Sequence, residues 1–486
     1  MSQSTDHYRT IRDAIASMPA EVANDAHGLQ APSLDELYAP QAHAAALDPM
    51  ASIVSGARGA GKSFWAGVLH DVNLRKAAAM AYPRLGLDRI DVGFGFTGLP
   101  GPEGVDKDRL DTCVPQDASL GQARAFWWAT ILRAVESSST GKQPRSLKEL
   151  IVVADDLEQR EALISGHDAA LRARRSSLLV IYDALDTVAS SWPRRRLLTQ
   201  ALLEVVWSMR AWKSVRPKLF LRPDQLEDDG LRFVELPKQR TGAVRLSWNG
   251  LDLYGLLFSR LALGPAARSF TWLLKQQELR TPKREEILAR TWPLTHDEMS
   301  QRRMMAVMAG EFMGNGPNGY KKGKTYDWPL AHLSDAFDEV TPRSFLGLMI
   351  GAAKFGQQPA DRVINADGIR HGLRAASKTR VDQLQQEFQW IKGTLAPLAG
   401  QLLPKPEREI FKVWDRAGTV AQALENARAY DYLPPFPEPN KATARDCYLA
   451  MERIGVMFRR KDERLDMPDL FRVAAKLLKK GGTAPV

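Results

Sequence analysis

Eight consecutive residues have the types and the order that a polyphosphate-binding segment needs. They are Gly56, Ala57, Arg58, Gly59, Ala60, Gly61, Lys62 and Ser63. This order matches the phosphate-binding loop pattern of a Gly, four residues, then Gly-Lys and Ser or Thr. Glycines allow the backbone to turn its N–H groups inward, against the dense negative charge of a triphosphate. The segment is therefore expected to bind the phosphates of a nucleotide.

The last residues of this segment each have a chemical role in such a site. Lys62 is expected to reach the β- and γ-phosphates, and the hydroxyl of Ser63 to ligate Mg²⁺. An apolar run over residues 50–55 predicts a buried strand before the loop, and residues 64–72 have a helical pattern. A helix that begins near Lys62 would direct the positive end of its dipole at the phosphates. We expect the ligand to be ATP with Mg²⁺, because the sequence shows no obvious guanine-reading motif.

A second segment supplies the acid that a Mg²⁺–nucleotide site requires. Within residues 177–188, a continuous apolar run ends at Asp183. A second acid, Asp186, follows three residues later. Such a run predicts a buried parallel strand, whose carboxyl end lies where open α/β sheets bind their ligands. Asp183 is then placed to hold Mg²⁺ together with Ser63. The alternative is a surface strand end with two solvated carboxylates.

Composition and charge limit the class of protein. The chain has 486 residues, 44% hydrophobic and 26% charged, which is ordinary for a soluble globular protein of several domains. Cys113 and Cys447 lie far apart without metal-type spacing, and no signal peptide or membrane span is indicated, so we expect a cytoplasmic protein. The net charge of +10 permits contact with nucleic acid, although a basic surface without a ligand explains it equally well.

The pattern of elements predicts four regions. They are a helical arm over 1–48, a nucleotide-binding domain over 49–250, a helical lid over 251–354, and a helical C-terminal region with a short basic hairpin over 355–486. Short apolar strands that alternate with helices predict a parallel α/β sheet in the second region. The strand candidates are Ala51–Ser55, Arg89–Phe96, Leu178–Asp183 and Lys218–Leu221. Between the second and third of these, Phe126, Trp127 and Trp128 are expected in the core, and a final helix is expected from Asp469 to about Lys480.

Four segments resemble those of a known ATPase class. The order Asp183-Ala184-Leu-Asp186 is similar to that of signal-transduction ATPases with numerous domains, especially their NACHT-type branch. Residues 218–224, with Arg222 before a proline, resemble the next strand of that class. Residues 341–344, Thr-Pro-Arg-Ser, resemble the second sensor of the wider AAA+ group. The C-terminal helix, hairpin and helix are similar to its winged-helix modules.

The resemblance implies an α/β P-loop NTPase with a parallel sheet flanked by helices, a helical lid and a winged-helix-like C-terminal module. Ala184 departs from standard AAA+ enzymes, which have a catalytic Glu there, so hydrolysis is expected to be slow. The implied function is a switch ATPase that acts as a homo-oligomer or with a partner protein. In prokaryotes, proteins that resemble this class often serve in antiphage defence. The alternatives are a DNA-loading or remodelling AAA+ ATPase, and a scaffold that binds nucleotide without turnover.

The resemblance also assigns catalytic roles, each with a structural alternative. Asp186 would polarise the attacking water, or cap a helix that begins near Thr187. Arg222 would sense the γ-phosphate, or be a solvated residue at a strand end. Arg343 would sense it from the lid, or form an ordinary salt bridge there. The run of arginines at 194–196 would supply an arginine finger or a phosphate patch, or line a solvated helix face.

Two basic segments are candidates for contact with nucleic acid. In the first, Lys321, Lys322 and Lys324 would neutralise phosphates while Tyr320 and Tyr326 stack on bases. A flexible surface connection is the alternative for this glycine-rich loop. In the second, the hairpin of Arg459–Lys461 with Arg464 would act as a basic wing on DNA, or the module would serve only for packing.

Overall fold

The computed structural model describes residues 3–19, 31–101, 104–140, 143–189, 191–228, 230–432, 434–436 and 438–485. Part of the predicted arm over 1–48 therefore lies outside the described residues. The chain divides into two compact units, one formed by Glu21–Ser247 and the other by Met1–Ala20 with Trp248–Val486. Within the described ranges, no helix has both the length and the apolar character needed to cross a membrane.

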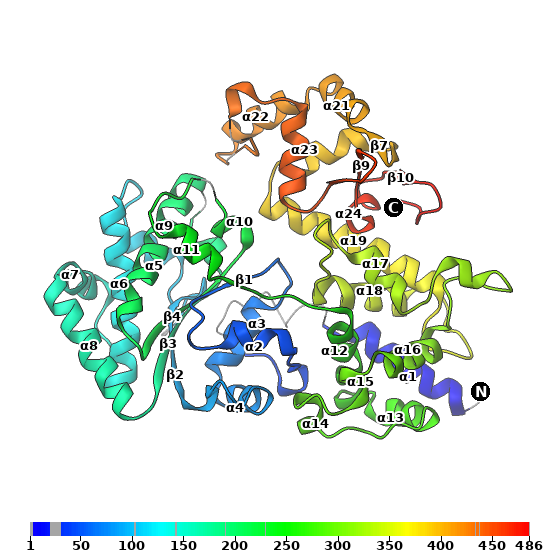
Figure 1. The fold of residues 1–486 in the computed structure, drawn as a ribbon, viewed down its shortest axis with the longest axis horizontal. Coiled ribbons are helices and arrows are strands. Elements are labelled where there is room, and N and C mark those ends of the chain that lie inside the picture. The colour runs from blue at the N-terminus through cyan, green and yellow to red at the C-terminus, as the bar shows by residue number, and fades with distance from the viewer. Residues whose placement is uncertain are drawn as a thin grey trace. The chain divides into compact units, whose positions relative to one another are not determined.

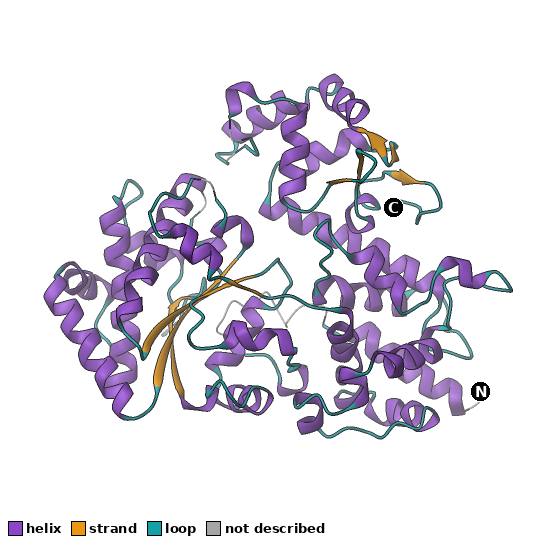
Figure 2. Cartoon of the chain, in the orientation of Figure 1, coloured by secondary structure: helices purple, strands orange, loops and turns teal. Residues whose placement is uncertain are grey.

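The first unit, Glu21–Ser247, is built on a five-stranded parallel sheet in the order β2-β3-β4-β1-β5. Its strands are β1 (Ile53–Ser55), β2 (Ile90–Phe96), β3 (Ser177–Tyr182), β4 (Val215–Leu221) and β5 (Val244–Arg245). Helices cover both faces of this sheet (Figures 1 and 2). The predicted α/β class and the four predicted strands are confirmed, whereas the two-residue strand β5 was too short to predict.

The helices of this unit connect and cover the strands. They are α2 (Ala44–Leu47), α3 (Lys62–His70), α4 (Val72–Ala81), α5 (Lys107–Cys113), α6 (Leu120–Thr140), α7 (Leu147–Asp155), α8 (Leu157–Ala173), α9 (Trp192–Ser208), α10 (Pro223–Leu226) and α11 (Leu236–Thr241). The core prediction for α6 is confirmed, because Phe126 and Trp127 are fully buried and Trp128 is only 7% exposed. The apolar run of β3 is also buried, as expected for a strand covered on both faces.

The second unit is mainly helical. Its helices are α1 (Gln3–Ser17), α12 (Gly250–Leu263), α13 (Ala267–Gln276), α14 (Arg284–Leu288), α15 (Pro293–His296), α16 (Glu298–Ala309), α17 (Asp327–Leu333), α18 (Pro342–Lys354), α19 (Ala366–Glu387), α20 (Ile391–Leu395), α21 (Glu407–Arg416), α22 (Thr419–Ala429), α23 (Ala444–Arg453) and α24 (Asp469–Arg472). Helix α1, from the start of the chain, packs against α13 and α18 of this unit.

Short strands end the second unit. They are β6 (Leu402–Leu403), β7 (Lys405–Pro406), β8 (Phe458–Arg459), β9 (Arg464–Asp466) and β10 (Leu478–Lys479). The predicted basic hairpin is present as β8–β9, which pairs with β7. The prediction of a final helix to Lys480 is wrong beyond Arg472. The buried guanidinium of Arg472 donates to the carbonyl oxygens of Leu477 and Thr483, and residues 478–479 pair with β6.

A buried lysine connects residues 46–51, which precede β1 and the phosphate loop, to the sheet. Lys218 of β4 is fully buried, and its Nζ donates to the carbonyl oxygens of Ala46, Asp48 and Ala51 at 2.8, 2.9 and 2.7 Å. These three acceptors match the three N–H donors of an ammonium group. Burial lowers the pKa of Lys218 to about 7. The chain entering β1 is therefore held by one side chain from the neighbouring strand.

A buried histidine connects the chain before β1 to α3, the helix that follows the phosphate loop. The indole of Trp65, in α3, donates to Nδ1 of His43 at 2.9 Å, and Nε2 of His43 lies 3.1 Å from the carbonyl oxygen of Ser247. A neutral ring with its proton on Nε2 satisfies both contacts, whereas an imidazolium cannot accept from Trp65. Burial lowers the pKa of His43 to about 4.

This arrangement predicts an acid-dependent loss of stability that depends on His43. The pKa is 6.5 in the unfolded chain and about 4 when folded, so stability present above pH 6.5 is lost as the pH falls toward 4. Between pH 7.5 and pH 5 the free energy of unfolding should fall by about 2 kcal/mol through this group. Urea unfolding at both pH values should show a smaller fall for His43→Gln. Equal falls in the two proteins would contradict the assignment.

Candidate phosphate-binding site

The eight-residue loop joins β1 to α3, with backbone geometry that its glycines permit. Gly59 has φ of 83° and Gly61 of 104°, in the left-handed region that L side chains disfavour. Gly56 has a different constraint, because a Cβ there would lie 3.3 Å from the Cβ atoms of both Ala60 and Leu246. The predicted strand, loop and helix are all present in the expected order.

The side chain of Lys62 lies over the loop itself. Its Nζ donates to the carbonyl oxygens of Gly56 at 2.8 Å and Ala57 at 3.1 Å. The loop is in turn held to the sheet, because the N–H of Gly56 donates to the carbonyl oxygen of Leu221 at 3.1 Å. An ammonium group is thus positioned at the loop, between the ends of β1 and β4.

Asp183 follows β3 and is almost completely buried, with 1% of its surface exposed. Burial raises the pKa of Asp183, while a hydrogen bond with the Ser63 side chain and the charge of Lys62 act in the opposite direction. Its Oδ2 atom has no hydrogen-bond partner among the described residues. The alternative of a solvated strand end is therefore wrong for Asp183. The predicted pair of Ser63 and Asp183 is together in the structure.

Asp186 lies in a 3₁₀ turn, η4 (Leu185–Thr187), which follows Ala184 in a left-handed conformation with φ of 53°. The next helix, α9, begins only at Trp192, so the alternative that Asp186 caps a helix starting near Thr187 is wrong. Burial acts to raise the pKa of Asp186, but the charges of Arg222, Lys62 and Arg58 outweigh it and lower that pKa below its ordinary value. Asp186 is thus a charged carboxylate close to the phosphate loop.

Arg222, at the end of β4, is 6% exposed, so the alternative of a solvated strand-end residue is wrong. Its Nε and Nη2 atoms donate to the two carboxylate oxygens of Asp224 at 3.0 and 2.7 Å. Its Nη1 atom lies 3.5 Å from Oδ2 of Asp186. Sequence analysis missed this role of Asp224, although an acid two residues after the arginine was the available signal.

The three arginines at the start of α9 have three different environments. Arg194 donates to Asp111 at 2.8 Å and to two backbone carbonyls, and Arg196 forms two 2.9 Å hydrogen bonds with Asp228. Both are structural ion pairs rather than a solvated face. Burial and the nearby charge of Arg222 lower the pKa of Arg195, which Asp186 and Asp224 partly oppose. Of these three, Arg195 is the one whose charge interacts with Asp186 and Asp224.

Arg343 belongs to the other unit. It lies at the start of α18, whose first turn is capped by Thr341, since the Thr341 side chain accepts from the N–H of Ser344 at 3.3 Å. The predicted sensor role of Arg343 stays a prediction. Within Glu21–Ser247, the structure brings together the other four predicted catalytic residues, which are Lys62, Asp183, Asp186 and Arg222.

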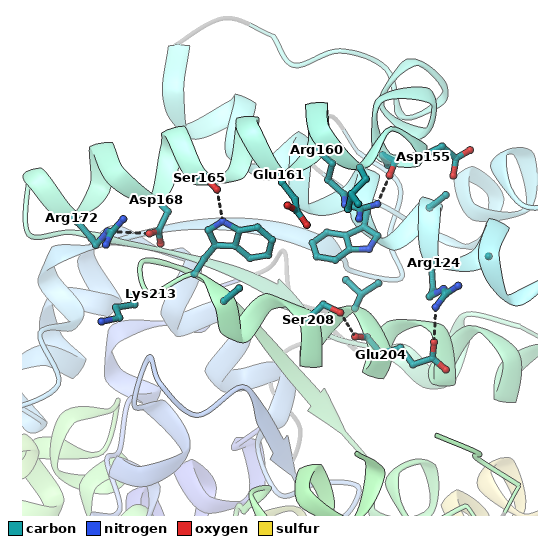
Figure 3. Close-up of a pocket in the computed structure, with 18 residues that line it drawn as sticks. Arg124, Asp155, Arg160, Glu161, Ser165, Asp168, Arg172, Glu204, Ser208 and Lys213 are labelled. Carbon is teal, nitrogen blue, oxygen red and sulfur yellow. Dashed lines mark hydrogen bonds and ion pairs between the residues drawn. The ribbon is translucent and has the colours of Figure 1, made fainter. Parts of the chain in front are cut away.

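The same unit has a separate concavity of about 830 Å³, lined by residues of α6 to α9 and the turn after α9 (Figure 3). Its polar side chains largely pair with one another. Trp212 donates to Ser165 at 2.9 Å, Arg172 pairs with Asp168 at 3.0 Å, and Arg124 pairs with Glu204 at 3.2 Å. The phosphate loop and its acids are a different site.

The chain matches no protein-family model, and no curated protein or solved structure is significantly similar to it.

The burial of Asp183 predicts that this carboxylate lowers the stability of the folded chain. Because its folded pKa is raised, ionisation penalises the folded state as the pH rises through the ordinary Asp range. Asp183→Asn should raise the free energy of unfolding at pH 7 by about 1–3 kcal/mol, the usual cost of an unsatisfied buried polar group. The gain should shrink as the pH falls and wild-type Asp183 becomes protonated. A destabilised variant at pH 7 would show that the charge is well compensated without a ligand.

Proposed function

We propose that the chain is a P-loop ATPase that binds Mg²⁺–ATP and hydrolyses it slowly, as a molecular switch. One observation carries this proposal: a Gly-Lys-Ser loop between a buried strand and a helix lies beside a buried acid with an unpartnered oxygen. A buried carboxylate without full compensation raises the free energy of the folded state, so a purely structural role does not explain Asp183. A cation bound with nucleotide would compensate it.

The sheet order supports a nucleotide at this edge. Strands β3, β4 and β1 are parallel neighbours, so Asp183, Arg222 and the phosphate loop all follow carboxyl ends at one edge of the sheet. Ligands of open α/β sheets bind outside the carboxyl ends of the strands, where connections diverge. The backbone N–H groups of the loop and the start of α3 would then face the phosphates.

The residues present fit a bound Mg²⁺. Magnesium sites in nucleotide-binding proteins use one or two protein oxygens, with phosphates and water as the other ligands. Ser63 and Asp183 supply these oxygens. When bound, Mg²⁺ neutralises negative charge on the phosphates during phosphoryl transfer.

The residues around Asp186 support slow turnover. Ala184 has no carboxylate, which leaves Asp186 as the charged acid available to orient water. Any contact of Arg222 with a γ-phosphate competes with its ion pairs to Asp224 and Asp186. A site in which an arginine must exchange partners suits a two-state switch better than a fast enzyme.

The resemblance to signal-transduction ATPases of the NACHT-type branch supports a regulatory role, with partner proteins or self-assembly, and extends to prokaryotic antiphage defence. The alternative of a DNA-loading or remodelling ATPase relied partly on a basic wing. In the C-terminal hairpin, Arg459 pairs with Glu407 and Glu463 at 2.5 and 3.1 Å. This pairing compensates the charge of the wing, so we favour the switch.

Nucleotide binding should depend on Lys62. Lys62→Ala removes a charge-assisted contact worth about 1.5–3 kcal/mol, so affinity for Mg²⁺–ATP should fall by roughly tenfold or more. Isothermal titration calorimetry measures this directly, with Lys76→Ala as a control, because Lys76 is an exposed lysine of α4 in the same unit. Unchanged affinity in Lys62→Ala would refute the phosphate-binding role of the loop.

Hydrolysis should depend on Asp186. Asp186→Asn keeps the shape but removes the charge that would orient water, so phosphate release should fall by about 10²–10⁴-fold while ATP affinity changes little. Phosphate release under saturating ATP, with calorimetric affinity measured in parallel, separates the two effects. Asp117→Asn, at an exposed carboxylate of the same unit, is the control. Wild-type turnover in Asp186→Asn would limit this residue to its ion pair with Arg222.

A further inference from the structure

The glycine-rich loop (residues 311–326) connects α16 to α17 and has a defined backbone fold (Figure 1). The N–H of Met313 donates to the carbonyl oxygen of Gly323 at 2.8 Å, and the N–H of Thr325 donates to that of Glu311 at 3.0 Å. These contacts pair the two ends of the loop as a short antiparallel ladder. The Thr325 hydroxyl also donates to the carbonyl oxygen of Gly310 at 2.5 Å.

Two glycines allow the middle of the loop to close on itself. A Cβ on Gly319 would lie 2.4 Å from the carbonyl oxygen of Gly314, and a Cβ on Gly314 would lie 2.9 Å from Cα of Gly319. The glycines therefore serve a close backbone approach. The η6 turn (Gly319–Lys322) directly follows this close approach, and Lys324 pairs with Phe312 in a β-bridge at the base of the loop.

Residues 320–324 expose positive charge and one aromatic ring. Lys321, Lys322 and Lys324 are exposed, and none of them forms an ion pair with a carboxylate in the described part of the chain. Tyr320 is 58% exposed, and Nζ of Lys321 lies 5.9 Å from its ring centroid. Tyr326 differs from the prediction: it is 4% exposed and stacks on another buried tyrosine, so it belongs to the core.

In the basic hairpin β8–β9, by contrast, the arginines form ion pairs with carboxylates. Arg460 pairs with Asp466 at 3.4 Å and Arg464 with Asp462 at 2.6 Å, in addition to the two ion pairs of Arg459. The sequence contains two similar basic clusters. In the hairpin, neighbouring carboxylates pair with all three arginines and Lys461 is exposed, whereas all three lysines of the glycine-rich loop face solvent.

We propose that the glycine-rich loop binds single-stranded nucleic acid. Its three lysines would contact successive phosphates, and the ring of Tyr320 would stack on an unpaired base. An exposed ring followed along the chain by three exposed lysines suits an unpaired strand better than a duplex, whose bases are already stacked on each other. This inference does not depend on ATP binding, since all of its residues belong to the Trp248–Val486 unit.

The test is a salt titration of fluorescent (dT)20 and of a duplex of the same length against the full chain. Lys321→Gln/Lys322→Gln/Lys324→Gln should reduce the slope of log K against log salt by about 2, at roughly 0.7 per phosphate contact. Affinity for (dT)20 at low salt should fall more than about tenfold. The charge-matched control Arg459→Gln/Arg460→Gln/Arg464→Gln should retain the wild-type slope. Tyr320→Ala should weaken binding about fivefold or more, and Tyr320→Phe should restore it.

Three results would overturn the proposal. They are no binding of (dT)20 by the wild-type chain at low salt, equal losses in the two triple variants, and duplex binding as tight as single-strand binding with no effect of Tyr320→Ala. The lysines are exposed, so thermal unfolding of the lysine variant should match the wild type and exclude misfolding as the cause. Lys62→Ala should leave (dT)20 binding unchanged, which separates failure here from failure of the proposed ATPase function.

Discussion

At the carboxyl end of β3, the carboxylate of Asp183 lies almost entirely out of water, and the surrounding site depends on how that charge is compensated. A buried anion raises the free energy of the folded state unless hydrogen bonds or opposite charges stabilise it. Ser63 and Lys62 supply part of this compensation from the phosphate loop. One carboxylate oxygen still lacks a partner among the described residues. A Mg²⁺ ion bound with nucleotide phosphates would complete it, so the feature that costs stability is the one that would provide binding.

The same edge of the sheet holds a chain of charges whose partners can change. Lys62 contacts carbonyl oxygens of its own loop, and Arg222 is shared between Asp224 and Asp186. Each of these cations has a protein partner that a phosphate group would replace. In our account, nucleotide binding therefore rearranges ion pairs at the ends of β1, β3 and β4. That is the kind of local electrostatic change by which nucleotide switches alter neighbouring segments.

Sequence analysis predicted the parts of the site that depend on local pattern. The loop glycines, Lys62 and the apolar run before Asp183 are contiguous in sequence, so spacing and hydrophobicity identify them. The ion pairs could not be predicted, because Arg194 and Arg196 look identical to Arg195 until tertiary contacts separate them. The prediction of a final helix to Lys480 was wrong for a related reason. The contacts of the buried Arg472 and the strand pairing of residues 478–479 override local helix propensity.

The proposed role of the loop and its acids is to recognise nucleotide phosphates through Mg²⁺. The most direct measurement is calorimetric titration of the wild-type chain with ATP, ADP and AMP, each with and without Mg²⁺. If this role is correct, ATP should bind at least about tenfold more tightly than AMP, because Lys62 would contact phosphates that AMP lacks, and Mg²⁺ should strengthen ATP binding. Equal affinities for ATP and AMP, or no binding of either with Mg²⁺ present, would contradict it.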